Sequence, residues 1–193
     1  MSRLPRPTRE QVDDEILDAA AVLFARHGFA QTSVQRIADA VGYSKTGLLH
    51  RFSTKEALHE ATLRRALDQV GQLAAGVEHL PAGPGRDRAV LDSLTDVALR
   101  RPGFVGVVLS SLNAEADSAT GEQLDAIALT LFRAFATDPD ADPARTLRLV
   151  VALGGLAVGT LACRPEAPVP GARDLIAAAA HDALGHARTT EEN

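Results

Sequence analysis

The residues best suited to chemistry in this chain are a serine, a lysine, a threonine and a glycine in a row. Ser44, Lys45, Thr46 and Gly47 follow a glycine turn and open a short segment that ends near Arg51. The N-terminus of a helix offers unpaired backbone N–H groups and a partial positive charge, and both attract phosphate. Lys45 adds a mobile cation there, and Gly47 is too small to block close approach to a surface. These residue types therefore indicate contact with the major groove of DNA.

A helix in that position needs a scaffold, and the residues before it predict two further helices. Apolar residues recur at three- and four-residue steps from Val12 to Phe24, which places them on one helical face. Gly28 ends this helix, because glycine tolerates the left-handed conformation of a C-terminal cap. Residues 34–41 form the second helix, which Gly42 closes. Three short helices with a glycine turn between the last two predict a helix-turn-helix domain over residues 9–55.

Hydroxyl residues before these helices predict their N-caps, because a cap side chain accepts a hydrogen bond from the first helical turn. Thr8 and Gln11 have the spacing of a capping box. The remaining predicted caps are Thr32 or Ser33, then Ser44, then Ser53 or Thr54.

Three stretches of this region match a known pattern: ILDAAAVLFARHGF, TSVQRIADAVGYSK and LLHRFSTKEAL. Through them, residues 16–58 resemble the DNA-binding domain of the TetR family of bacterial one-component repressors. The resemblance implies base contacts from the start of the third helix, base or backbone contacts from the second, and phosphate contacts around them. The candidate DNA-binding residues are Thr32, Ser33, Gln35, Arg36, Tyr43, Ser44, Lys45, Thr46, Gly47, His50, Arg51 and Lys55.

Three departures from the family pattern affect what the resemblance implies. Thr46-Gly47 reverses the usual glycine-threonine order, so the family's base preference does not transfer. Leu49 replaces a tyrosine whose hydroxyl often meets phosphate. Tyr43 stands where valine is usual, and it is either a substitute phosphate contact or a partly buried core residue. A three-helix segment also occurs as a plain packing motif, so the motif alone does not establish DNA binding.

The rest of the chain predicts more helices and no strand. Apolar residues make up 46% of the sequence and aromatic residues 4%, with alanine and leucine dominant. The predicted fold is all-α with about nine helices: the N-terminal helix-turn-helix domain, and a larger domain over residues 56–188 that binds an effector and dimerises. Residues 1–60 carry equal numbers of acidic and basic side chains, so the net charge of −5 lies entirely in the remainder.

A long apolar segment, residues 147–163, predicts a helix that one neighbour cannot cover, because it is apolar on several faces. The resemblance implies that this helix and the last one pair across a twofold axis in a homodimer. The alternative is an intramolecular core helix. Its longest uncharged stretch, residues 149–163, is shorter than the roughly 20 residues that cross a bilayer, so no membrane partner is predicted.

The resemblance also implies a small-molecule effector inside the C-terminal domain. Few charged residues fall on the inward faces of the helices, which favours a largely apolar effector. For each candidate lining residue, a simple core position is the favoured interpretation over contact with a ligand. The candidates are Leu94, Phe104, Val108, Leu112, Leu131 and Phe135.

No catalytic motif, metal-ligand spacing or phosphate-binding glycine loop is visible, so neither an enzyme nor a cofactor is predicted. Cys163 is the only cysteine, which fits a reducing cytoplasm. The predicted function is a cytoplasmic transcriptional repressor that leaves a palindromic, double-stranded DNA operator when its effector binds. The alternative is a helical small-molecule-binding protein without specific operator binding.

Overall fold

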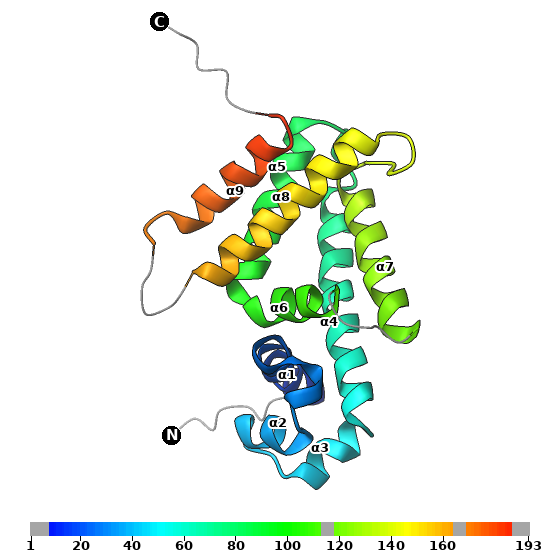
Figure 1. The fold of residues 1–193 in the computed structure, drawn as a ribbon, viewed down its shortest axis with the longest axis vertical. Coiled ribbons are helices and arrows are strands. Elements are labelled where there is room, and N and C mark those ends of the chain that lie inside the picture. The colour runs from blue at the N-terminus through cyan, green and yellow to red at the C-terminus, as the bar shows by residue number, and fades with distance from the viewer. Residues whose placement is uncertain (1–7, 113–117, 164–168, 187–193) are drawn as a thin grey trace, which may run out of the picture.

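The computed structural model describes residues 8–112, 118–163 and 169–186, and within these ranges every regular element is a helix (Figure 1). The helices are α1 (Arg9–Gln31), α2 (Val34–Ala40), α3 (Lys45–Arg51), α4 (Lys55–Val77), α5 (Pro84–Arg100), α6 (Pro102–Leu112), α7 (Ser118–Ala134), α8 (Pro143–Ala162) and α9 (Ala172–Ala183). The predicted all-α fold is confirmed. Helices α1–α3 occupy one end of the molecule, α8 and α9 lie side by side towards the other, and α4 joins the two parts.

The caps explain where the short N-terminal helices begin and end. Thr8 and Gln11 form the predicted capping box at the start of α1. Gly28 has a φ of 77°, so the regular helix breaks there and a last turn follows to Gln31. Where the sequence left two choices, Ser33 caps α2 and Thr54 caps α4.

Two apolar cores hold the helices together. The first core contains buried residues of α1, α2, α3 and the first half of α4, together with Phe104 and Val107 of α6. The second core joins α5, α8, α9 and the far half of α4, and it includes Ala134 and Phe135 at the end of α7. The division expected at residues 55 and 56 remains a prediction, but the first core extends across it. The DNA-binding end is therefore held by α6 as well as by α4.

Two glycines let α6 lie directly against α1. A Cβ atom on Gly103 would lie 2.7 Å from the backbone nitrogen of Val22. A Cβ atom on Gly106 would lie 2.5 Å from the Cβ of Ala25. Both separations are shorter than van der Waals contact, so only glycine fits this crossing without a shift of the backbone or of a neighbouring side chain.

Helix α8 is exposed along one side and buried along the other. Leu149, Ala152, Leu156 and Thr160 face the second core. By length and composition alone, α8 is apolar enough to cross a membrane, and it is the one such helix among the described residues. The sequence-based exclusion of a membrane span by length therefore does not hold for this helix. Its buried stripe nevertheless packs against α5, α6 and α9, as a helix of a globular bundle does.

Candidate nucleic-acid interface

The start of α3 is exposed, while Leu48 in the same helix is buried. Leu48 is 0% exposed in the first core and fixes one face of this two-turn helix. The Ser44 hydroxyl accepts a hydrogen bond from the N–H of Gly47 at 3.0 Å. Lys45 and Thr46 are exposed beside this cap. The predicted arrangement at the start of the third helix, small polar residues and one cation on an open helix N-terminus, is therefore present.

Gly47 has a structural role that the sequence did not reveal. A Cβ atom at this position would lie 3.1 Å from the Ser44 Oγ, which is tighter than ordinary contact. The glycine thus leaves room for the cap as well as for an approaching surface. His50, in the last turn of α3, is exposed.

Helix α2 contributes a second exposed row beside α3. Ser33, Gln35 and Arg36 are exposed. The Gln35 Nε2 donates a hydrogen bond of 2.6 Å to Asp39 Oδ1, so Gln35 is held in place by its own helix. Tyr43, between the two helices, is half-buried and packs against the first core.

Thr32 does not belong to the exposed set, and its prediction as a DNA contact is corrected. Its side chain is buried, with the residue 1% exposed. The hydroxyl donates to the carbonyl oxygens of Gly28 and Leu23, at 2.8 Å and 3.1 Å. Thr32 therefore stabilises the C-terminal end of α1, and its neighbour Ser33 is the N-cap of α2.

Lys55 and Arg51 are engaged within the protein. The Lys55 Nζ donates to the Phe29 carbonyl oxygen at 3.0 Å and lies 4.2 Å from the centre of the Phe29 ring. A lysine in the first turn of α4 opposes the helix dipole, and these contacts to the end of α1 explain its position without a phosphate. Arg51 forms an ion pair with Asp13 of α1.

The acidic residues of α1 are ion-pair partners as well as complements to the helix dipole. Asp14 accepts a hydrogen bond of 2.5 Å from Arg65 of α4. Asp18, one helical turn further on, accepts one of 3.2 Å from Arg101. Burial raises the pKa of Asp18 from its ordinary value, while Arg101 opposes that shift. The spacing of Asp14 and Asp18 by four residues was the available sign that they share a helix face.

Known proteins share both this N-terminal region and the whole fold. The family model for bacterial regulatory proteins of the TetR family matches residues 16–62. The chain is similar to the HTH-type transcriptional regulator RutR of Escherichia coli K12, at 49% identity over 53 residues that cover 28% of this chain and 25% of RutR. It is also similar to the HTH-type transcriptional repressor KstR2 of Rhodococcus jostii RHA1, at 45% identity over 56 residues that cover 29% and 28%.

The fold extends the likeness beyond the matched segment. The crystal structure of a TetR-family transcriptional regulator from Bordetella parapertussis 12822 superimposes with a TM-score of 0.68, covering 91% of this chain and 94% of that one at 22% identity. Residues 16–62 therefore match the DNA-binding region of TetR-family regulators. The sequence match itself spans only about a quarter of the length of the curated relatives. The sequence likeness to TetR-family regulators is therefore confined to the DNA-binding region, and the C-terminal region shares only the fold.

The six predicted effector contacts do not form one cluster. Phe104, Val108 and Leu131 pack with the first core, whereas Leu94 and Phe135 pack with the second. Leu112 is 61% exposed, so its prediction as a pocket residue is corrected. Helical periodicity identified inward faces for the others, but it does not distinguish the two cores or reveal whether space remains between them.

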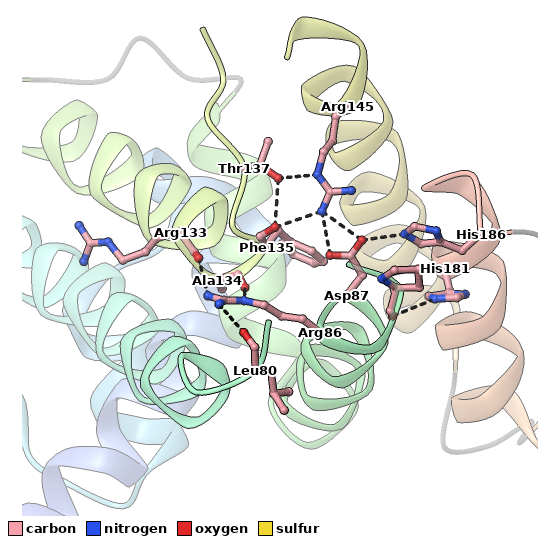
Figure 2. Close-up of polar contacts among 11 residues, drawn as sticks. Leu80, Arg86, Asp87, Arg133, Ala134, Phe135, Thr137, Arg145, His181 and His186 are labelled. Carbon is pink, nitrogen blue, oxygen red and sulfur yellow. Dashed lines mark hydrogen bonds and ion pairs between the residues drawn. The ribbon is translucent and has the colours of Figure 1, made fainter. Parts of the chain in front are cut away.

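The start of α5 carries a buried polar network that the sequence did not reveal (Figure 2). Asp87 is 0% exposed and accepts hydrogen bonds from Arg145 of α8 at 2.8 Å and 3.0 Å. The His186 Nε2 lies 2.7 Å from the Oδ2 of the same carboxylate. Arg86 donates to the carbonyl oxygens of Leu80, which follows α4, and of Arg133 and Ala134 at the end of α7. These contacts join α5 to α7, α8 and the segments that follow α4 and α9, at the end of the molecule away from α3.

Proposed function

We propose that this chain is a transcriptional repressor that acts in the cytoplasm, binds a palindromic DNA operator as a homodimer, and releases it when a small molecule binds. The observation that carries the proposal is the exposed start of α3, held by the buried Leu48. Short helices of this kind insert their N-terminal residues into the major groove. Two similar proteins, RutR and KstR2, are named as a transcriptional regulator and a transcriptional repressor, which supports the DNA-binding part.

The proposed contact surface is the predicted set without Thr32. Lys45, Thr46 and Gly47 supply base contacts, and Ser44 and His50 lie beside them. Ser33, Gln35, Arg36 and Tyr43 supply contacts from and next to α2. Arg51 and Lys55 contribute positive charge near the phosphates while they remain tied to Asp13 and to the end of α1.

The exposed side of α8 supports the homodimer. Leu147, Val151, Val158 and Leu161 are large, apolar and exposed, and they recur along one face of the helix. Gly154 lies on the same face, with no atom within 4 Å of a Cβ built there. A stripe of this kind is costly in water, and pairing with a second copy would bury it. Two copies would then present two α3 helices to half-sites one DNA turn apart, about 34–36 Å.

We expect Lys45→Ala to weaken binding to the DNA fragment upstream of the chain's own gene. Each base or phosphate contact of this kind contributes about 1–3 kcal/mol, so the Kd rises several-fold or more. Fluorescence anisotropy at fixed salt measures the change, because protein–DNA affinities depend steeply on ionic strength.

Arg133→Ala is the matched control for Lys45→Ala. It removes the same charge from an exposed side chain at the end of α7, and we expect the Kd to stay unchanged. If the wild type binds this fragment no better than unrelated DNA, the alternative applies: a helical small-molecule-binding protein without specific operator binding. The proposal does not include catalysis.

We expect Val151→Arg to convert the dimer to a monomer and to abolish tight operator binding. The substitution places a charge in the middle of the exposed stripe, where a paired interface would bury it without a partner. Sedimentation velocity gives the oligomeric state of the same samples that are used for anisotropy.

Leu129→Arg provides the comparison, because Leu129 of α7 is as exposed as Val151 and lies outside the stripe. This variant should remain dimeric and bind DNA as the wild type does. A wild-type chain that sediments as a monomer, or a Val151→Arg variant that stays dimeric, would rule out this interface.

A further inference from the structure

A hollow of about 490 Å³ lies between α4 and α5, on the side of α4 that meets the acidic face of α1. Arg65 and Gln69 of α4 contribute to its lining, as do Arg100 at the end of α5 and Arg101 after it. Leu73 and Val97 supply apolar surface. None of the six residues predicted to contact an effector lines this hollow.

The charge in the hollow is predominantly positive. Its one carboxylate, Asp96, is already bonded by Arg173 at 2.9 Å and 3.3 Å. Hydrogen bonding to Arg173 lowers the pKa of Asp96, so this carboxylate stays ionised and paired. Arg100 is exposed, and its charge also helps to lower the pKa of Asp96, but it makes no hydrogen bond or close ion pair with any residue that the structure describes. At least one guanidinium group is therefore available to a ligand.

Two buried polar atoms at the hollow have no hydrogen-bond partner among the described residues. They are the Nε of Arg65 and the Oε1 of Gln69. Buried polar groups in folded proteins are almost always hydrogen-bonded, so an unsatisfied donor and acceptor in one hollow need an explanation. A ligand with acceptor oxygens would satisfy Arg65, and the Gln69 amide can present either its oxygen or its NH₂ group.

We propose that this hollow binds a small divalent anion, a phosphate or a dicarboxylate, which acts as an effector. Guanidinium groups bind planar or tetrahedral oxyanions through paired hydrogen bonds, and three of them line the site. Leu73 and Val97 offer apolar contact to a short carbon skeleton. Anion binding does not depend on the proposed function, whereas the effector role rests on the proposed function as a DNA-binding regulator.

Anion binding in the hollow can affect the DNA-binding end directly, because two arginines that line the hollow also form ion pairs with α1. Arg65 pairs with Asp14, and Arg101 pairs with Asp18. An anion in the hollow competes with these carboxylates for the guanidinium groups and weakens the ties between α1 and the C-terminal part. Since α1 positions α2 and α3, the anion lowers operator affinity, and bound operator lowers anion affinity by the same factor.

Calorimetric titration of the full-length protein tests the site, with inorganic phosphate and succinate as separate probes at constant ionic strength. We expect saturable binding of at least one probe, and the stronger probe indicates whether the ligand carries phosphate or carboxylates. Arg100→Ala should weaken this binding about tenfold, because it removes the available guanidinium. Arg64→Ala is the matched control, since Arg64 is an exposed arginine of α4 outside the hollow.

The proposal would be overturned if neither probe bound saturably, or if Arg100→Ala and Arg64→Ala weakened probe binding equally.

Operator binding by the same proteins tests the effector role. The bound probe should raise the operator Kd of the wild type and of Arg64→Ala by more than an equal ionic strength of NaCl does. Arg100→Ala should show only the NaCl effect. Binding of the probe without this difference would overturn the effector role. Operator binding without anion binding would overturn the anion site and leave the repressor proposal intact. Anion binding without operator binding would overturn the repressor proposal and leave the anion site intact.

Discussion

Asp87→Ala should lower the free energy of unfolding by about 3–5 kcal/mol, the typical cost of breaking a buried ion pair by removing one partner. Asp87 is fully buried, and its carboxylate contacts both Arg145 and His186. Its removal leaves the Arg145 guanidinium with the Thr137 hydroxyl and the Phe135 carbonyl as its remaining partners. Urea unfolding monitored by circular dichroism gives the change in free energy.

Asp174→Ala tests whether burial is the reason for this effect. Asp174 also pairs with an arginine, Arg173, but its side chain is 75% exposed. Exposed ion pairs contribute about 0–1 kcal/mol, so this variant should unfold close to the wild type. Similar losses in the two variants would show that the Asp87 network does not stabilise the junction of α5, α8 and α9. Operator binding at low temperature should survive Asp87→Ala, since the network lies far from α3 (Figure 1).

Gly103→Ala should destabilise the protein by about 1–3 kcal/mol, the usual cost of overpacking a close contact. The new methyl group meets the backbone nitrogen of Val22 at 2.7 Å, and backbone of a helix cannot move aside as a side chain can. The displaced α1 also carries the DNA-binding end, so operator affinity should fall in the same variant. Thermal unfolding and anisotropy measure the two effects.

Gly76→Ala serves as the comparison for this glycine. Gly76 lies in the last turn of α4, and a Cβ atom there meets nothing within 4 Å. Alanine favours a helix interior over glycine by about 1 kcal/mol, and less at a helix end, so this variant should be at least as stable as the wild type. A Gly103→Ala protein that unfolds like the Gly76→Ala protein would mean that α1 and α6 are not in close contact.

The sequence predicted the helices well because each carries its own signal. Regular apolar spacing and hydroxyl caps are local features, and the structure follows them to within a few residues at most ends. The exposed set on α3 was predictable for the same reason, since a two-turn helix with one buried leucine must present its other faces. Thr32 was predicted wrongly because a hydroxyl beside a helix suits a cap, a phosphate contact or a tie to an earlier carbonyl equally well.

Contacts between distant segments left no such signal. Arg51, Arg65 and Arg101 pair with residues of α1 that lie 38, 51 and 83 positions away. A charge run at the start of a helix is explained adequately by its own dipole, so nothing in the sequence required these partners. The α4–α5 hollow was missed for a related reason. It is lined largely by polar residues, whereas the sequence pattern that predicts an effector pocket is a set of apolar helix faces.

The participation of α6 in the first core limits how this protein can be recombined with its relatives. A hybrid regulator that joins residues 9–55 of this chain to the C-terminal part of a relative would lose Phe104 and Val107 from its first core. It would also lose Gly103 and Gly106, which leave room for Val22 and Ala25 of α1 against α6. The transplantable unit is the DNA-binding end together with α6 and the first half of α4, although those segments are separated in the chain.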